Sequence, residues 1–207
     1  MKKIRLKKQR LYGPDVFLQE YKGQLVVQKT YQHRLLPVKT LGVGLIAWES
    51  FIYSKLTGIK GIPKLIATPD RYSLTTSFMG GENLRETRRR PDNAYFDEVE
   101  KIITKMHARG VIHLDLRNRR NYGIDDCGMP YLMDFANCLY LPWPHALKNC
   151  MARIDWMGYL KIKYKTNPDL VSPIEYKRFS FGQTLSTLWL PGKAFKAFKN
   201  IIKQLKS

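Results

Sequence analysis

The sequence predicts an α+β fold in which a strand-rich first portion precedes a mainly helical second portion, with a cleft between two lobes. Two β-type segments, VFLQEY and QLVVQKTY, lie between Val16 and Tyr31 and are separated by Lys22-Gly23, a pair typical of a turn. Apolar residues at helical spacing predict an amphipathic helix over Asn93–Arg109, and the chain after about Trp143 is mostly helical in pattern. The length of 207 residues suits one domain built from two small lobes.

Shorter elements fill the chain between these parts. They are, in order, a helix at Gly42–Leu56, strands at Pro63–Ala67 and Ser73–Met79, a strand at Val111-Ile112, and a hairpin of NYGI and YLMDF around Asp125-Asp126-Cys127-Gly128. Gly80-Gly81 stops the last strand of the first portion. We therefore expect an N-lobe over residues 1–79, a hinge over residues 80–84 and a C-lobe over residues 85–207.

The charge of the chain is large and uneven. The formal net charge is +19, from 36 Lys and Arg against 17 Asp and Glu. Residues 1–64 carry 13 basic and 3 acidic side chains, residues 65–134 carry 11 of each, and residues 135–207 carry 12 and 3. Solubility does not need so large an excess, so basic ends around a neutral centre indicate an anionic partner: nucleic acid, a phosphorylated substrate or an anionic membrane surface.

Composition excludes several classes of protein. An apolar fraction of 44% with 26% charged residues is typical of a globular chain and excludes wholesale disorder. No apolar stretch reaches the roughly 18 residues of a membrane span, and the basic run MKKIRLKKQR lacks the apolar core of a signal peptide. Cys127, Cys138 and Cys150 form no CxxC pair, which indicates reduced thiols in a cytoplasmic protein and argues against a disulfide scaffold or structural zinc.

Polar residues cluster in the segment HARGVIHLDLRNRRNYGIDDCGMPYLMDFAN, residues 107–137. Asp115 and Asn121 follow a short strand, and Asp134 ends the next apolar strand thirteen residues after Asn121. Two carboxylates and an amide at adjacent strand ends suit phosphoryl transfer: one Asp accepts the proton of an attacking hydroxyl, while the amide and the second Asp hold Mg²⁺ against the phosphates. A single Asp in such a loop is more often a cap, but the ordered set favours the catalytic interpretation.

This ordered set resembles the catalytic core of the protein-kinase-like superfamily, H-x-D-L followed by an Asn and then by D-F-G. The resemblance implies that Asp115 is the catalytic base and that His113 is the structural histidine. It also implies that Arg117 balances charge on the moving phosphoryl group. Asn121 and Asp134 match the metal ligands of the superfamily.

The chain departs from that pattern at two positions of the loop. Asp115 and Asn121 are six residues apart, where the kinase pattern has five. Asn118 is therefore an alternative metal ligand, although its distance along the chain to Asp134 is longer than the superfamily has. Ala136 replaces the Gly of D-F-G and is small enough to keep the turn.

The resemblance continues on both sides of the loop. Lys29 lies in the apolar strand LVVQK and matches the lysine that holds the α- and β-phosphates, and Glu49, twenty residues later, matches its acidic partner. Residues 77–83 match the hinge that holds adenine through backbone groups, which implies Ser77 and Met79 as nucleotide-binding residues. Asp155 matches an aspartate that braces the catalytic loop, with an ordinary acid near a helix N-terminus as the alternative.

The absence of two motifs narrows the choice among the families of this superfamily. No G-x-G-x-x-G precedes Lys29 and no A-P-E follows Asp134. Over roughly residues 15–175 the chain is similar to minimal kinases of the bacterial lipopolysaccharide-kinase type (Kdo and heptose kinases), and also to RIO-type atypical protein kinases. The resemblance implies ATP as the donor, Mg²⁺ with Mn²⁺ as an alternative, and a lipopolysaccharide core sugar as the acceptor. The alternatives are a serine/threonine protein kinase of RIO-like type and a pseudokinase that binds partners without turnover.

The last seventeen residues, PGKAFKAFKNIIKQLKS at 191–207, predict a basic amphipathic helix with its apolar side chains within about 120° of arc. Such a helix can lie on an anionic membrane surface, or it can dock its apolar side on the C-lobe. We therefore expect a cytoplasmic protein, with a peripheral position at the inner face of the cytoplasmic membrane as one arrangement. Nucleic acid is not expected as a partner, because the basic residues are not interleaved with a stacking platform.

Overall fold

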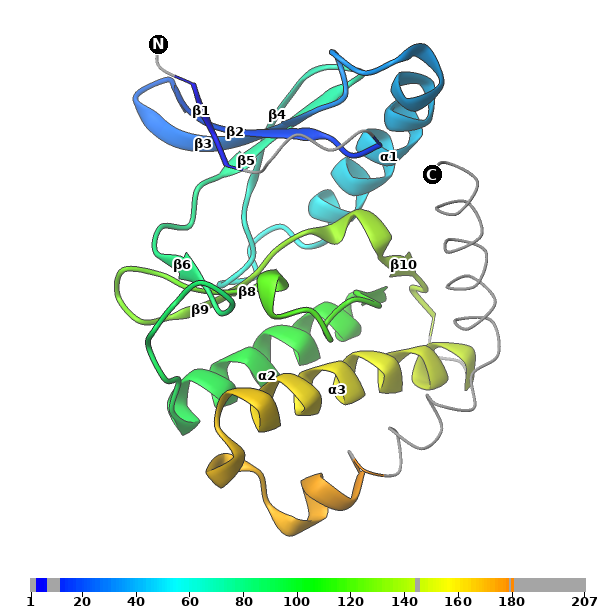
Figure 1. Ribbon diagram of the computed structural model, residues 1–207. Helices are drawn as coiled ribbons and strands as arrows, with labels where there is room; N and C mark the ends of the chain where they lie inside the picture. Colours follow the sequence, from blue (N-terminus) through cyan, green and yellow to red (C-terminus); the bar gives the residue numbers. More distant parts are fainter. Residues whose placement is uncertain (1–2, 7–11, 144–145, 179, 181–207) are drawn as a thin grey trace, which may run out of the picture.

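The computed structural model describes residues 3–6, 12–143, 146–178 and 180, and has a sheet with one helix above a mainly helical part (Figure 1). The upper sheet has five antiparallel strands in the order β1-β2-β3-β5-β4. Their bounds are Ile4–Arg5 (β1), Asp15–Tyr21 (β2), Gln24–Thr30 (β3), Leu65–Asp70 (β4) and Ser73–Ser77 (β5). The predicted strand pair between Val16 and Tyr31 is confirmed, whereas β1 is too short for a period-two pattern to reveal.

Strand β3 lies in the middle of this sheet and carries Lys29. It pairs with β2 from Asp15↔Thr30 to Tyr21↔Gln24, and with β5 through Lys29↔Leu74. The turn between β2 and β3 places Gly23 at a φ of 78°, a left-handed value that glycine accepts without steric cost. Because both edges of β3 are paired, the backbone that carries Lys29 has a fixed position in the sheet.

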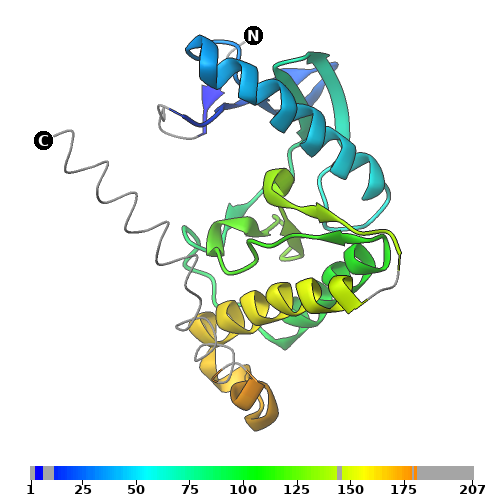
Figure 2. The same cartoon turned by 90° about the vertical axis from the view of Figure 1, so that its right-hand side faces the viewer.

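Helix α1, Leu36–Lys55, runs along one face of the upper sheet (Figure 2). It begins six residues before the predicted start at Gly42, because Pro37 lies in its first turn, where a missing N–H removes no helical hydrogen bond. Gly42 lies directly against the ring of Tyr31 at the end of β3, so a side chain at this position would displace the ring. The helix and the sheet are therefore packed closely at this point.

The lower part contains two helices and two small sheets. Helices α2, Asn93–Ala108, and α3, Ala146–Thr166, pack on each other (Figure 1). One small sheet has the order β6-β8-β9 and the other pairs β10 with β7. The strand bounds are Glu82–Asn83 (β6), Val111–Ile112 (β7), Tyr122–Ile124 (β8), Pro130–Leu132 (β9) and Leu139–Tyr140 (β10). Short 3₁₀ helices lie at Arg119–Asn121, Phe135–Asn137 and Pro168–Leu170.

One hydrophobic core extends from α1 into the lower part. It joins Ile52 of α1 to Leu116 and Phe135 of the loops between the small sheets. The apolar stripe predicted for α2 is confirmed, because four of its side chains are fully buried: Phe96, Val99, Ile103 and Met106. The helix begins where predicted, because the Asp92 carboxylate caps it by accepting the Tyr95 amide at 2.9 Å.

The fold class predicted from sequence, an α+β fold with a sheet-rich first part and a helical second part, is confirmed. Cys127, Cys138 and Cys150 form no disulfide in the structure, and their reduced state stays a prediction. No helix in the described ranges is both long and apolar enough to cross a bilayer. The predicted amphipathic helix at 191–207 lies outside the described residues.

Candidate active site

Lys29, Glu49 and Asp134 meet between the upper sheet and the lower part. The Lys29 ammonium lies 2.7 and 2.8 Å from the two Glu49 carboxylate oxygens and 3.0 Å from Oδ1 of Asp134. The Glu49 side chain is only 2% exposed, whereas that of Asp134 is 36% exposed, so Asp134 is the more accessible carboxylate of this group. Burial alone would lower the pKa of Lys29, but Glu49 and Asp134 outweigh burial and raise it, so Lys29 is positively charged.

Helix α3 holds the loop that carries Asp115 in place. The buried Asp155 carboxylate accepts the amides of His113 and Leu114, both at 2.7 Å, and contacts Nε2 of His107 at 2.9 Å. Leu114 has a φ of 62°, a left-handed conformation in which its amide and that of His113 both point at the carboxylate. Asp155 lies in the middle of α3, so it braces the loop as the resemblance implies and is not an acid at a helix N-terminus.

Asn121 returns to Asp115 despite the extra residue between them. Its amide nitrogen donates to the backbone oxygen of Asp115 and to Oδ2 of the same residue, both at 3.0 Å. The extra residue is accommodated by the 3₁₀ turn Arg119–Asn121, which Asn118 caps by accepting the Arg120 amide at 3.2 Å. Asn118 also lies near Asp115, with a donor distance of 3.4 Å to Oδ2, but its oxygen is engaged in the cap. The geometry therefore favours Asn121 over Asn118 as the residue facing the site.

Asp134 begins a turn that tolerates Ala136. It has a φ of 70°, and the 3₁₀ helix Phe135–Asn137 follows directly. Ala136 therefore has a right-handed conformation, which needs no glycine. The buried ring of Phe135 packs against His113, with ring centroids 5.0 Å apart, and Nε2 of His113 lies 3.1 Å from the Met133 carbonyl oxygen. His113 thus joins the Asp115 loop to the Asp134 turn.

Arg117 lies beside the carboxylate of Asp115. Its Nε atom is 3.8 Å from Oδ1 of Asp115, and its side chain is 72% exposed. Its backbone rests on α3 at Gly158, where an added Cβ would lie 2.7 Å from the Arg117 nitrogen. The guanidinium can therefore reach a ligand while its backbone is fixed.

The segment between β5 and β6 joins the upper sheet to the lower part. The Ser77 hydroxyl accepts the Lys64 amide at 2.9 Å and contacts the Met79 sulfur at 3.8 Å, so its side chain faces the neighbouring β4 end of the sheet. Gly80 and Gly81 both have positive φ, and a side chain on Gly81 would collide with the Ile124 carbonyl oxygen. Ser77 and Met79 lie in the predicted hinge, and their contact with a nucleotide stays a prediction.

The sequence did not predict a contact that fixes helix α1 next to Glu49. Trp48 donates from its indole nitrogen to the Cys138 carbonyl oxygen at 3.0 Å, and it stacks on Phe51 with ring centroids 5.6 Å apart. Phe51 in turn meets Tyr140 of β10 edge to face at 5.2 Å. An aromatic residue directly before Glu49 was the available signal, but its partner is ninety residues away.

The donor set suits a hard cation. Because the amide nitrogen of Asn121 donates to Asp115, its oxygen is the atom that can ligate a cation together with the Asp134 carboxylate. Such oxygen donors suit Mg²⁺, which takes few protein ligands and completes its coordination with water and phosphate oxygens. Within the described ranges no three His, Cys, Asp or Glu side chains are grouped closely enough to hold a metal ion by themselves.

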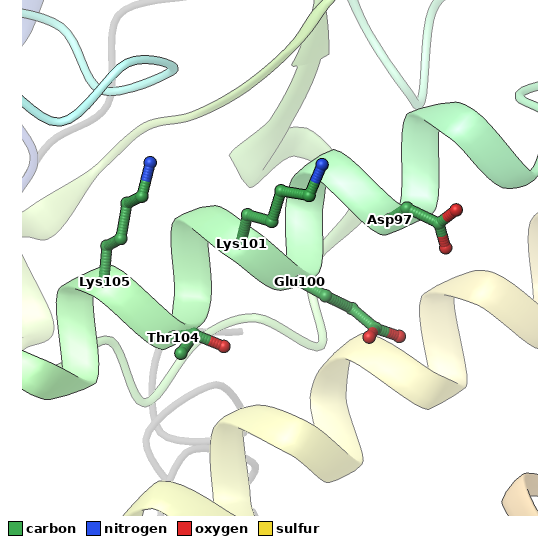
Figure 3. A pocket seen from close by; sticks show the side chains of 5 residues that line it. All are labelled: Asp97, Glu100, Lys101, Thr104 and Lys105. Carbon is green, nitrogen blue, oxygen red and sulfur yellow. The ribbon is translucent and has the colours of Figure 1, made fainter.

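A hollow on the exposed side of α2 lies apart from these residues. It is lined by Asp97, Glu100, Lys101, Thr104 and Lys105, all from one helix (Figure 3). Two of these side chains are acidic and two are basic, and Lys101 is paired with Glu98 at 2.6 Å. It shares no residue with the group around Lys29 and Asp115.

Comparison with solved structures identifies the fold. The Rio2 kinase from Chaetomium thermophilum matches with a TM-score of 0.60 and 15% identity, over 82% of this chain and 60% of that one. The same enzyme in an ADP/Mg²⁺-phosphoaspartate complex matches with a TM-score of 0.60 and 16% identity, over 81% of this chain and 58% of that one.

This chain thus spans about three fifths of the length of the Rio2 structures it matches. Scans against protein-family models and against curated protein sequences gave no match. With identity this low, the likeness concerns the fold alone. The chain has the protein-kinase-like α+β fold seen in Rio2 kinases.

Proposed function

We propose that this chain is an ATP- and Mg²⁺-dependent phosphotransferase of atypical, RIO-like type that moves the γ-phosphate to a hydroxyl. The observation that carries the proposal is the position of Lys29, which contacts both Glu49 and Asp134 within 3.0 Å. Such a lysine neutralises phosphate charge while its buried partner keeps it in place. The two Rio2 structures add support through their shared fold and, in one of them, bound ADP and Mg²⁺.

Each residue of the loop has a distinct task in this proposal. Asp115 orients the acceptor hydroxyl and accepts its proton, while Arg117 balances charge on the transferred group. Asn121 and Asp134 hold Mg²⁺, which supplies charge neutralisation of the phosphates. His113 positions the loop through its contacts with Met133 and Phe135. Residues 80–84 act as the hinge between an N-lobe, 1–79, and a C-lobe, 85–207, and the backbone at Ser77 and Met79 binds adenine.

The acceptor is best proposed as a serine or threonine hydroxyl of a protein, since the similar structures are named as Rio2 kinases. A lipopolysaccharide core sugar is the second candidate. It is favoured by the net charge of +19 and by the missing A-P-E segment. In that case we propose a cytoplasmic enzyme that works peripherally at the inner membrane face, with residues 191–207 as its contact to anionic lipid.

The test uses purified chain with γ-labelled ATP, Mg²⁺ or Mn²⁺, and three acceptors: the chain itself, casein and lipopolysaccharide. We expect transfer that falls at least a hundredfold in Asp115→Asn. Label that hydroxylamine removes would identify a phosphoaspartate. ATP binding without any transfer above the Asp115→Asn background would instead identify a pseudokinase and overturn the enzyme proposal.

A further inference from the structure

Helix α3 touches the Asp115 loop along one side and then continues beyond it (Figure 2). At Gly158 the helix is in backbone contact with the loop, since an added Cβ would lie 2.7 Å from the Arg117 nitrogen and 2.8 Å from the Leu116 carbonyl carbon. Lys161 and Lys165 follow three and seven residues after Gly158, on the same side of the helix. The side of α3 that leaves the loop therefore carries two lysines beyond its contact with the Arg117 backbone.

Lys161 lies close enough to Lys165 and Arg117 to experience their positive charges. Burial lowers the pKa of Lys161, and the positive charges of Lys165 and Arg117 lower it further. Arg117 and Lys165 are exposed and Lys161 is partly so. Lys161 is thus flanked by two accessible cations, one of which, Arg117, lies beside Asp115.

Within the described residues, no Asp or Glu side chain neutralises the two lysines. Every Asp and Glu of the sequence falls in the described ranges, and none of them lies within 4.0 Å of the Lys161 or Lys165 ammonium groups there. The same helix does pair its buried lysine, because Lys163 contacts Glu175 at 2.8 Å. The side of α3 next to the loop is thus left unneutralised, while another lysine of the helix is paired.

We infer that Arg117, Lys161 and Lys165 form an anion site that binds a phosphate group carried by the acceptor; we call it the α3 anion site. A bound phosphate relieves the repulsion that Lys161 experiences from Arg117 and Lys165, and the guanidinium has enough donors to contact this phosphate as well as the transferred group. Since Arg117 lies 3.8 Å from Asp115, a hydroxyl on the same acceptor molecule can approach the Asp115 carboxylate. The inference rests on the proposed function and gives its acceptor a class: hydroxyl compounds that already bear a phosphate.

A binding measurement tests the site without any turnover. Inorganic phosphate is titrated into the full chain at constant ionic strength and followed by calorimetry. The double variant Lys161→Gln/Lys165→Gln should bind phosphate at least tenfold more weakly. The control Lys60→Gln/Lys64→Gln, which removes the same charge from two exposed lysines, should stay within twofold of the unaltered chain. Equal binding by the two double variants overturns the inference.

A transfer measurement identifies the source of the phosphate. Acceptors are compared in pairs: a serine peptide with and without a neighbouring phosphoserine, glucose 6-phosphate with glucose, and phosphatidylcholine vesicles bearing lipopolysaccharide with and without its phosphates. We expect the phosphorylated member of one pair to react at least tenfold faster, and the advantage to vanish in Lys161→Gln/Lys165→Gln while ATP hydrolysis is unchanged. An advantage that survives in this variant overturns the inference. Absence of all transfer alongside intact phosphate binding overturns the proposed function and leaves the anion site established.

Discussion

The indole nitrogen of Trp48 donates a hydrogen bond of 3.0 Å to the carbonyl oxygen of Cys138. This bond joins α1 to the segment that follows Asp134, one residue before Glu49 on the helix. That segment continues into β10, which pairs with β7 through Leu139↔Ile112 directly ahead of the Asp115 loop. The position of Glu49 is therefore coupled to the backbone on both sides of the candidate site.

Replacing Trp48 by Phe should lower the activity through the loss of one hydrogen bond. The ring contact with Phe51 is retained, and one hydrogen bond worth about 1 kcal/mol is lost. If that bond holds Glu49 against Lys29, kcat/KM for ATP should fall roughly fivefold, the rate equivalent of about 1 kcal/mol. Leu41→Ala, an exposed change on the same helix, is the control and should leave kcat/KM unchanged. Equal effects of the two variants would show that the indole bond does not position Glu49.

Replacing Asp155 by Asn should destabilise the chain and disable the loop. The carboxylate accepts two amides and contacts His107, whereas the Asn side chain offers one acceptor and turns a donor toward groups that need an acceptor. Breaking a buried charged network of this kind costs about 3 kcal/mol. Urea unfolding would measure it, with the exposed Asp97→Asn as a control. Unchanged protection of the His113 and Leu114 amides from hydrogen exchange would contradict this role of Asp155.

Two glycines with positive φ allow the energetic cost of backbone strain to be measured separately from the cost of a steric collision. Gly128 has a φ of 84° and open space around it, so Gly128→Ala should cost about 1–2 kcal/mol from backbone conformation alone. Gly81 has a φ of 58°, and its added methyl group would also collide with the Ile124 carbonyl oxygen. Gly81→Ala should therefore cost clearly more, and it should also raise the KM for ATP. Chemical denaturation of both variants measures the two losses. Equal losses would mean that the backbone at Gly81 can move away from the Ile124 carbonyl oxygen without cost.

The ion pair between Lys163 and Glu175 predicts that the stability of the chain depends on pH in the acidic range. Burial alone would raise the pKa of Glu175, but hydrogen bonds from Lys163 and Ser172, both at 2.8 Å, outweigh burial and lower it. A carboxyl with a lowered pKa in the folded state stabilises the chain above its unfolded pKa of about 4.3, and this contribution is lost as the pH falls through the folded pKa.

Glu175→Gln should thus lower the free energy of unfolding by about 1 kcal/mol at pH 7 and much less near pH 3. Unfolding by urea at both values of pH measures the difference. The exposed Asp169→Asn should show no comparable dependence. A loss of equal size at both pH values would mean that the carboxylate charge contributes nothing.

Much of the candidate site could be predicted because its residues lie at characteristic spacings in local patterns. Lys29 in an apolar strand, Glu49 in a helix and Asp134 at a strand end were each visible in sequence, and the structure brings them together. The roles proposed for them stay predictions. What local patterns could not supply were contacts between distant segments, such as Trp48 with Cys138 or the pairing of Glu82 with Ile124.

The loop around Asn121 shows a different limit. The spacing from Asp115 did not decide between Asn118 and Asn121 as the metal ligand, because the number of residues does not reveal the backbone conformation of the loop. One 3₁₀ turn takes up the additional residue and returns Asn121 to Asp115. The early start of α1 was readable in principle, because Pro37 is a common first-turn residue, but the predicted helix began only at Gly42.

The hydrogen bonds between Asp155 and the His113 and Leu114 amides also affect the order in which the parts of the chain fold during synthesis. Asp155 comes about forty residues after the loop that it holds, so a chain emerging from the ribosome completes the upper sheet and α2 well before α3 is available. Until α3 docks, two loop amides lack their acceptor and Leu114 has no reason to adopt its left-handed conformation. Nascent chains therefore acquire a competent Asp115 loop only after α3 has been synthesised and has docked.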